Sequence, residues 1–463
     1  MPAGDGGHRM KKTAAARSRP HADPRSTRTG PDLEGGDPVV VRAPAQPQPI
    51  LLPPDPGEPI PSLGAALERI ARDALTPSPP GPVGLEAEWH VVDRALPHHR
   101  PAHARIRAVT DHLVLPAGGS ITTEPGGQVE ISSAVHDGVL SALRALEADA
   151  SALREAFAHD GLGLCALGAD PLRPPMRVHP GSRYAAMEAS FAAAGHGSAA
   201  AQMMTSTASL QINVEAGERG SLARRFWLAQ ALGPALLTAF ASSPYINGVD
   251  TGWSSARQLA WLRLDPTRTR ALAVSRDDTE DALRAAWARF VLDATVLVVP
   301  DGDAHVSGGG VVPFASWITG EAGLLGRRPT WGDLAYHLTT VWPPVRMRGF
   351  LELRWLDALP SALLPVAAAT VVTLLDRVPD EAAEIVAPVA GKWHVAARWG
   401  LRDLPLQQAA VALLQLAATS FAGVDEEIAE RIADYCASHT TCGLSPVDAV
   451  RALTPLDALL TTS

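Results

Sequence analysis

The sequence predicts an α+β fold, because two kinds of periodic segment alternate along most of the chain. In the longer segments apolar residues recur every three or four positions, as they do on the buried side of a helix. In the shorter segments apolar and polar residues alternate, which is typical of a β-strand with one buried face. The chain has 463 residues, of which 46% are hydrophobic and 19% are charged, so it is long enough to form a sizeable core.

Seven segments have the periodicity of a helix. In the first, Leu63, Ala66, Leu67 and Ile70 lie on one side, and charged residues lie elsewhere. The segment 222–241 is apolar on nearly every side, so we expect a helix that is buried all round. The predicted helices span residues 62–75, 138–158, 222–241, 279–292, 361–375, 404–422 and 425–437.

Four shorter segments alternate between apolar and polar residues, and we predict strands at 83–92, 128–132, 209–215 and 350–356. Residues i and i+2 of a strand point to the same side, so each predicted strand has one polar face. In chain order, these polar faces carry Glu86, Glu88, Glu130, Gln211, Asn213, Glu215, Glu352 and Arg354.

Two explanations fit these polar faces. A solvent-exposed face of an antiparallel sheet is polar without having any function. Such a face usually mixes Lys, Thr, Ser and Arg, whereas these positions are mainly carboxylates and amides, in a chain with only three lysines. Clustered carboxylates raise one another's pKa unless a cation lies among them, and Mg²⁺ is a hard cation that takes oxygen ligands. The residue types therefore favour a magnesium site.

A further carboxylate, Glu124, lies in a predicted turn before the second strand. Pro125 restricts φ, and Gly126 and Gly127 let the chain turn tightly toward Glu130. The turn would then bring Glu124 and Glu130 to one place, although a surface turn of this composition needs no function.

Several arginines and aromatic residues lie beside Gly or Pro rather than in the middle of a predicted helix: Arg183 with Tyr184, Trp253 with Arg257, and Arg346. The arginine side chain offers a fork of donors that binds a carboxylate or a phosphate. These positions suit a site that handles both an amino acid and a nucleotide. Helix capping or a structural ion pair would explain each of them equally well.

Composition argues against several other classes of protein. The net charge of −9 is unlike that of a dedicated nucleic-acid binder. The only Gly-Lys pair, at Gly391, has Val386 and Trp393 where a P-loop needs Gly and Ser or Thr. The longest uncharged apolar run, 358–375, is short for a membrane span and contains two prolines, so no membrane association is expected. Three cysteines are too few for a disulfide framework and fit the reducing cytoplasm.

The first 60 residues hold 12 of the 40 prolines and have no periodic apolar pattern. We predict that they form a disordered tail rich in Pro and Arg. Residues 61–463 are expected to form one domain, which is helical from about residue 400.

Six blocks between about residues 84 and 400 form an ordered set. The two most specific are EPGGQVEIS at 124–132 and the run HLTT, PPVR and LELR within 337–354. The others are GLEAEW at 84–89, GSRYAAM at 181–187, STASLQINV at 206–214 and TGWSSAR at 251–257. Together they resemble the plant-type glutamate–cysteine ligase family, and within it the bacterial branch that makes γ-glutamylcysteine for ergothioneine.

The resemblance implies a glutamine-synthetase-like fold, in which a curved, largely antiparallel sheet has helices packed behind it. It implies that the domain joins L-glutamate to L-cysteine with ATP and Mg²⁺, through a γ-glutamyl phosphate. By matching motifs, the implied metal ligands are Glu86, Glu88, Glu124, Glu130, Gln211 and Glu352, supported by Asn213. Arg346 and Arg354 would act on the transferred phosphate, and Arg183, Tyr184, Trp253 and Arg257 would bind the amino acids.

Two positions depart from the family pattern. Thr205 stands where a Cys is expected, and Ser242 stands where an Asn is expected. The second change could reshape the loop before Thr251, and the cysteine pocket with it. Two alternative functions remain open: a ligase that joins glutamate to a different amine, and a non-catalytic binding protein on the same fold. The oligomeric state and the number of metal ions also remain open.

Overall fold

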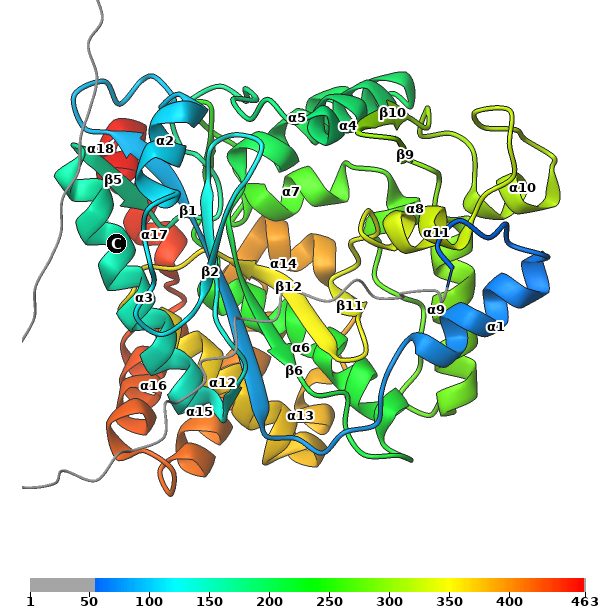
Figure 1. Ribbon diagram of the computed structural model, residues 1–463. Coiled ribbons are helices and arrows are strands. Elements are labelled where there is room, and N and C mark those ends of the chain that lie inside the picture. Colours follow the sequence, from blue (N-terminus) through cyan, green and yellow to red (C-terminus); the bar gives the residue numbers. More distant parts are fainter. Residues whose placement is uncertain (1–54, 462–463) are drawn as a thin grey trace, which may run out of the picture. The chain divides into compact units, whose positions relative to one another are not determined.

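The structure is a computed structural model that describes residues 55–461 (Figure 1). Its central feature is a sheet of eight strands, six of which follow the order β11-β12-β6-β1-β3-β2. Two short strands, β4 and β5, pair with opposite ends of β1, and every pairing in the sheet is antiparallel. The strands are β1 (Pro82–Asp93), β2 (Ser120–Thr123), β3 (Val129–Ser132), β4 (His136–Asp137), β5 (Leu162–Cys165), β6 (Ser209–Val214), β11 (Val345–Met347) and β12 (Leu351–Asp357).

All four predicted strands are present, as β1, β3, β6 and β12. The prediction of an α+β protein with a largely antiparallel sheet is therefore confirmed. The sequence analysis missed β11, which has only three residues, and β5, which is buried along its whole length. A strand that is buried on both faces has no alternation between apolar and polar residues.

The register of the sheet brings the polar faces of the strands together. Glu86 lies opposite Gln211, and Glu88 lies opposite Glu130. On the other side of β6, Glu352 of β12 lies opposite Asn213, and Arg346 of β11 lies opposite Glu352. Antiparallel partners point to the same face of a sheet. One face of the sheet is therefore rich in carboxylates, amides and arginines.

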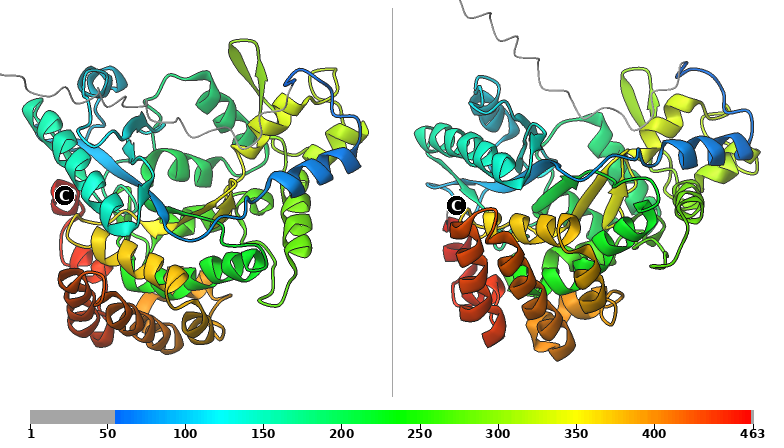
Figure 2. Two further views of the ribbon diagram at one scale, coloured as in Figure 1. Left: turned by 60° about the horizontal axis from the view of Figure 1, so that its bottom comes forward. Right: turned by 90° about the horizontal axis from the view of Figure 1, so that it is seen from below.

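Helices cover the opposite, apolar face of the sheet (Figure 2). The helix α3 (Val139–His159) packs on β1, and α6 (Leu222–Phe240) packs on β12. Every residue of α6 except Arg224 is buried, as its apolar composition predicts. Further helices pack behind them: α12 (Leu364–Asp376), α13 (Pro379–Val386), α15 (Leu404–Phe421) and α16 (Glu426–Ser438).

Side-chain caps explain where several predicted helices begin. Ser62, Thr279, Asp403 and Asp425 each accept a hydrogen bond from a backbone N–H three residues later. These residues precede α1 (Leu63–Asp73), α9 (Glu280–Asp293), α15 and α16. The helix starts therefore agree with the predicted ones to within a residue or two.

A second group of elements lies beyond the polar face of the sheet (Figure 1). It includes α4 (Ser182–Ala193), α5 (Gly197–Ser206), α7 (Ala256–Leu262), α11 (Trp331–Leu338) and a hairpin of β9 (Val298–Asp301) and β10 (Ala304–Ser307). The helix α4 packs against α5 and the hairpin, and α5 packs against α7. These elements and the polar face enclose the site described below.

The remaining elements connect these layers. They are α2 (His103–Thr110), β7 (Tyr245–Ile246), β8 (Val249–Asp250), α8 (Pro266–Thr269), α10 (Phe314–Thr319), α14 (Trp393–Trp399), η1 (Gly400–Arg402), η2 (Thr440–Cys442), α17 (Pro446–Arg451) and α18 (Pro455–Leu460). From residue 400 to residue 461 all the regular elements are helices. No helix within residues 55–461 combines the length and the apolar character needed to cross a membrane.

The prediction of a disordered tail over residues 1–60 falls mostly outside the described part of the chain. Residues 1–54 lie outside the described part, but Ile60 is completely buried and Pro59 forms a β-bridge with Thr330. Ile60 belongs to the main hydrophobic core. Ile60, the last residue of the predicted tail, therefore packs in the folded core, and the tail itself stays a prediction.

Candidate active site

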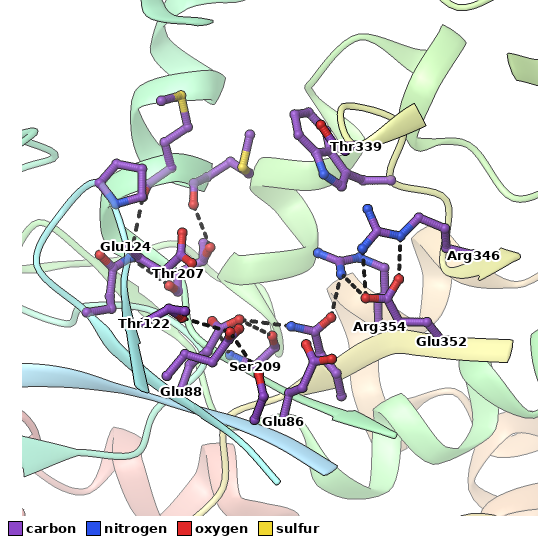
Figure 3. Close-up of a pocket in the computed structure, with 18 of the residues that line it drawn as sticks. Glu86, Glu88, Thr122, Glu124, Thr207, Ser209, Thr339, Arg346, Glu352 and Arg354 are labelled. Carbon is purple, nitrogen blue, oxygen red and sulfur yellow. Dashed lines mark hydrogen bonds and ion pairs between the residues drawn. The ribbon is translucent and has the colours of Figure 1, made fainter. Parts of the chain in front are cut away.

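The polar face of the sheet forms the floor of a cavity of about 470 Å³ (Figure 3). With two exceptions, all the predicted site residues line it: Glu86, Glu88, Glu124, Glu130, Arg183, Tyr184, Gln211, Arg257, Arg346, Glu352 and Arg354. The exceptions are Asn213, whose amide donates a hydrogen bond to Glu86, and Trp253. Side chains from separate stretches of the sequence thus meet in one hollow.

One wall of the cavity is acidic. Glu88 accepts hydrogen bonds from the backbone N–H and the hydroxyl of Ser209, both at 2.9 Å, and from the Gln211 amide at 3.1 Å. Glu86 accepts one from Asn213 at 2.9 Å, which gives Asn213 its predicted supporting place. These donors fix the two carboxylates of β1 where the acidic wall meets the sheet.

Two more carboxylates complete the acidic wall. Glu130 accepts a hydrogen bond from the Thr122 hydroxyl at 2.9 Å. Glu124 lies in the turn before β3, and no side chain or backbone N–H of the described residues donates to its carboxylate. The predicted meeting of Glu124 and Glu130 is found, since both line the same cavity.

Burial and mutual repulsion disfavour negative charge on this wall. Burial, with a contribution from Glu130, raises the pKa of Glu86 to about 7. Burial and the neighbouring Glu88 raise the pKa of Glu130 to about 7, and burial and Glu130 raise the pKa of Glu124 to about 8. A divalent cation would relieve this repulsion, so the donor set fits Mg²⁺.

The spacing of the carboxylates limits how an ion could be held. Among residues 55–461, no three His, Cys, Asp or Glu side chains lie close enough to surround one ion. Mg²⁺ commonly takes only one or two protein carboxylates and completes its octahedron with phosphate oxygens and water. An ion at the acidic wall would accordingly combine one or two of these carboxylates with oxygens of phosphate and water.

The two glycines of the EPGGQ turn are required for steric reasons. A Cβ on Gly126 would lie 2.1 Å from the Thr205 carbonyl oxygen, and Gly127 has a φ of +84°. The Gln128 amide donates to the Thr207 carbonyl at 2.8 Å. The turn is thus docked on the end of α5, and this contact places Glu124 over the sheet.

A buried ion cluster supports the same turn, and nothing in the sequence pattern pointed to it. Arg100 donates to the Gly126 carbonyl at 3.2 Å and to the Ser206 hydroxyl at 2.9 Å. Asp170 pairs with Arg100 at 3.2 Å and with Arg173 at 2.8 Å. All three charged side chains are at most 3% exposed. The partners of Arg100 are far away along the chain, so only the fold brings them together.

Replacing Asp170 with Ala should destabilise the protein by about 3 to 5 kcal/mol, because Arg100 and Arg173 would remain buried without their carboxylate. Urea unfolding measures the free energy. The control is Asp160→Ala, which removes a half-exposed partner of Arg105 and should cost less than about 1 kcal/mol. Similar losses in the two variants would contradict a structural role for the buried cluster.

The opposite wall of the cavity is basic. Arg346 donates from Nε and Nη2 to the two oxygens of Glu352, the second at 2.7 Å. Arg354 donates to the same carboxylate at 3.1 Å, and Arg348 lies 3.5 Å from it. Burial by itself raises the pKa of Glu352, but Arg346 and Arg354 outweigh it and hold that pKa at about 2. Three cations share one carboxylate, and the surplus positive charge suits a polyphosphate.

Arg348 was missed by the sequence analysis, although it lines the cavity two residues after Arg346. Its buried Nε has no hydrogen-bond partner among residues 55–461. The alternation of polar and apolar residues points to it, because Arg346 and Arg348 stand on either side of Met347. Arg346 lies in β11, and Arg348 is the first residue after that strand. The strand itself was not recognised, so this alternation was not used.

Arg257 is held from behind by a second buried carboxylate, Asp357. The two side chains are 4.0 Å apart, and Arg257 donates to the backbone carbonyl of Arg354 at 2.6 Å. Asp357 accepts hydrogen bonds from the Ser243 hydroxyl at 2.7 Å and from the Ser242 backbone N–H at 3.1 Å. The loop that departs from the family pattern at Ser242 therefore supports Arg257.

Trp253 is a predicted amino-acid-binding residue that the structure places apart from the others. Trp253 does not line the cavity. Its ring packs edge-on against His394, with a centroid distance of 4.9 Å, and Arg398 lies 5.9 Å from the ring. Trp253 therefore joins its loop to α14, and only Arg257 of the TGWSSAR block reaches the site.

Comparisons with known proteins agree with this geometry. The profile of the family described as "Glutamate-cysteine ligase family 2 (GCS2)" matches residues 82–437. The glutamate–cysteine ligase EgtA of Mycolicibacterium smegmatis is 48% identical over 357 residues, which are 76% of this chain and 83% of that protein. EgtA of Mycobacterium tuberculosis is 43% identical over 389 residues, which are 83% of this chain and 88% of that protein.

A solved structure shares the fold. The glutamate–cysteine ligase of Francisella tularensis, solved in complex with AMP, superposes with a TM-score of 0.51 at 14% sequence identity. The match covers 83% of this chain and 88% of that one. The glutamine-synthetase-like fold expected from the sequence is thus confirmed. Because the family profile spans most of the folded part and two relatives exceed 40% identity, the chain belongs to glutamate–cysteine ligase family 2.

Proposed function

We propose that this protein is an ATP-dependent glutamate–cysteine ligase that makes γ-glutamylcysteine, ADP and phosphate, as the step that supplies ergothioneine biosynthesis. The observation that carries the proposal is a single cavity in which four carboxylates face three arginines. A phosphoryl-transfer site needs this combination, because catalysis there consists mainly of positioning and charge neutralisation. The high identity to proteins named glutamate–cysteine ligase supports the choice of amino acids.

The first step is the phosphorylation of glutamate. An oxygen of its γ-carboxylate attacks the γ-phosphorus of ATP, and the bond to the bridging oxygen breaks as ADP leaves. Arg346, Arg348 and Arg354 would bind the oxygens on which charge develops. Glu352 holds these arginines in place, and the Gln211 side chain accepts a further hydrogen bond from Arg354.

In the second step the cysteine amine attacks the γ-carbonyl carbon of the glutamyl phosphate. The new C–N bond forms, the C–O bond to phosphate breaks, and phosphate leaves with the proton that the amine gives up. The intermediate is an activated acyl group that water would destroy. The cavity is therefore required to hold cysteine against it while excluding solvent.

Mg²⁺ bound with the nucleotide would neutralise the charge of the β- and γ-phosphates. Each ion would take one or two of its ligands from Glu86, Glu88, Glu124 and Glu130, with Gln211 beside them. Glu352 belongs to the predicted ligand set as well, but its oxygens are occupied by arginines here. The cytoplasm is the proposed location, because Cys165, Cys436 and Cys442 are all free thiols.

The test is ADP release measured with each substrate left out in turn. We expect full release only when Mg-ATP, glutamate and cysteine are all present. Release that needs glutamate but is equally fast with another amine in place of cysteine would identify a different acceptor. Nucleotide binding without any glutamate-dependent ADP release would refute a ligase.

A further inference from the structure

Part of the cavity wall differs from the charged remainder. Met187 of α4 and Met203 and Met204 of α5 line it, together with Trp261 and Trp342. The three methionines are 4 to 8% exposed and belong to a separate hydrophobic cluster outside the main core. We call these five residues the methionine wall. Thioether groups are soft, adaptable and poor hydrogen-bond partners, so this wall suits a small group that needs little hydration.

Arg183 lies beside the methionine wall and has no counter-ion. Within residues 55–461, its guanidinium forms no ion pair with a carboxylate. It donates from Nη1 and Nη2 to the Thr339 hydroxyl, both at 3.2 Å, and stacks on Tyr336 at 4.8 Å. These contacts orient the group and leave N–H donors for an anion that comes from outside the chain.

Arg183 and Met187 are one helical turn apart on α4, so their side chains lie on the same face. Both line the cavity. In cysteine, the carboxylate and the thiol are separated by two carbon atoms. One helix face therefore presents an anion site and a soft apolar surface to the same cavity, the two features that a small amino acid with a sulfur side chain requires.

The position in the cavity is also right for the second substrate. The arginines that suit the phosphates surround Glu352, whereas Arg183 is next to the turn of Glu124. Figure 3 shows Glu124 and Arg346 on opposite sides of the pocket. The amine adds to one face of the planar glutamyl carbonyl, so it needs a place beside the glutamyl group that the phosphate and ADP do not occupy. We place the acceptor at the end of the cavity that holds Arg183 because this end is the one farther from Arg346 and the rest of the basic wall.

We propose that Arg183 binds the carboxylate of the acceptor cysteine and that Met187 and Met203 contact its thiol. The proposal rests on the function proposed above and adds the residues that select the acceptor. A serine hydroxyl placed against these methionines would lose its hydrogen bonds to water and gain none, whereas a thiol loses little. The methionine wall is thus a specificity device for sulfur over oxygen.

The first test removes the carboxylate from the substrate and its partner from the protein. In Arg183→Gln, kcat/KM for L-cysteine should fall by about 10- to 100-fold, the range for losing a charge-assisted hydrogen bond. With cysteamine, which lacks the carboxylate, kcat/KM should change by less than about threefold. KM for glutamate should be unchanged, and Arg183→Lys should recover part of the loss because it keeps the charge.

The second test concerns the thiol. In Met203→Gln, the ratio of kcat/KM for L-cysteine to that for L-serine should fall at least about tenfold, because the amide can pair with the hydroxyl. Met203→Leu, which stays apolar, should keep the ratio. The control is Met176→Gln at a half-exposed position outside the cavity, where no change is expected. Thermal midpoints near that of the wild type show that the variants are folded.

Three outcomes would overturn the proposal. Equal losses with cysteine and cysteamine, or a raised KM for glutamate, would place Arg183 at the glutamate instead. A raised KM for ATP in Met203→Gln would make the methionine wall an adenine site. An unchanged cysteine-to-serine ratio would remove its role in selection. Failure of the proposed function would look different, because the wild type would then release no ADP with glutamate, or would release it equally fast with another amine in place of cysteine.

Discussion

Glu352→Gln is expected to lower kcat by at least about 100-fold, the scale for the loss of one preorganised electrostatic group. Glu352 is 1% exposed and accepts hydrogen bonds from Arg346 and Arg354, with Arg348 close by. The neutral amide would leave three guanidinium groups without a carboxylate between them. They would repel one another and lose the arrangement that the transferring phosphate requires.

The same variant distinguishes two roles for Glu352. If it acts by holding the arginines, the Mg²⁺ concentration for half-maximal activity should stay the same while kcat falls. If it is a metal ligand, as the resemblance implies, that concentration should rise as well. Steady-state kinetics over a Mg²⁺ series separates the two roles. The control is Glu215→Gln, just after β6 but outside the cavity, which should behave like the wild type. A kcat for Glu352→Gln within a few-fold of the wild type would contradict both roles.

The strands that build the site could be predicted because each has one apolar and one polar face. Glu86, Glu88 and Glu130 stand at alternate positions between buried residues, so the pattern alone placed them on one side. The strand β11 alternates in the same way but has only three residues, too few for the alternation to be recognised as a strand. Arg348 was missed with it.

The supporting residues had no local signal at all. Arg100 meets Gly126, Ser206 and Asp170 only because the chain folds back on itself. The methionines of α4 and α5 have the spacing of ordinary core residues, and most of their surface is indeed core. Trp253 shows the opposite case. It belongs to a specific motif, but its side chain packs against His394 of α14 and does not line the cavity.

The acidic wall implies a cost in stability that the bound ligands would offset. Glu124, Glu86 and Glu130 all have a raised pKa, so each favours the protonated form in the folded state more than in the unfolded state. The unfolded chain then binds fewer protons than the folded one between about pH 4.5 and 8. By linkage, the free energy of unfolding falls as the pH rises through that window. This cost is a property of the protein without metal or nucleotide.

Glu124→Gln should therefore stabilise the metal-free protein and disable the enzyme. The variant lacks a half-buried carboxylate whose charge no hydrogen bond compensates, so in EDTA its melting temperature should exceed that of the wild type by about 1 to 3 °C at pH 8. The difference in melting temperature should shrink toward zero near pH 4.5, where Glu124 of the folded wild type is protonated and therefore as uncharged as the Gln of the variant. Differential scanning calorimetry over a pH series measures it, and Glu147→Gln, at an exposed site, should show no such trend.

Substrates should reverse the order of stability. Mg-ATP and glutamate bind only the folded state. They raise the free energy of unfolding by an amount that grows with the logarithm of their affinity. If Glu124 contributes to holding Mg²⁺, the wild type should gain more than the variant and should melt at the higher temperature when saturated. The kcat of the wild type should exceed that of Glu124→Gln by about 100-fold. A variant that is less stable than the wild type in EDTA at pH 8 would mean that the Glu124 carboxylate is already compensated by the protein. Glu124 would then be a structural group, and the turn that carries it would have to be explained without the metal.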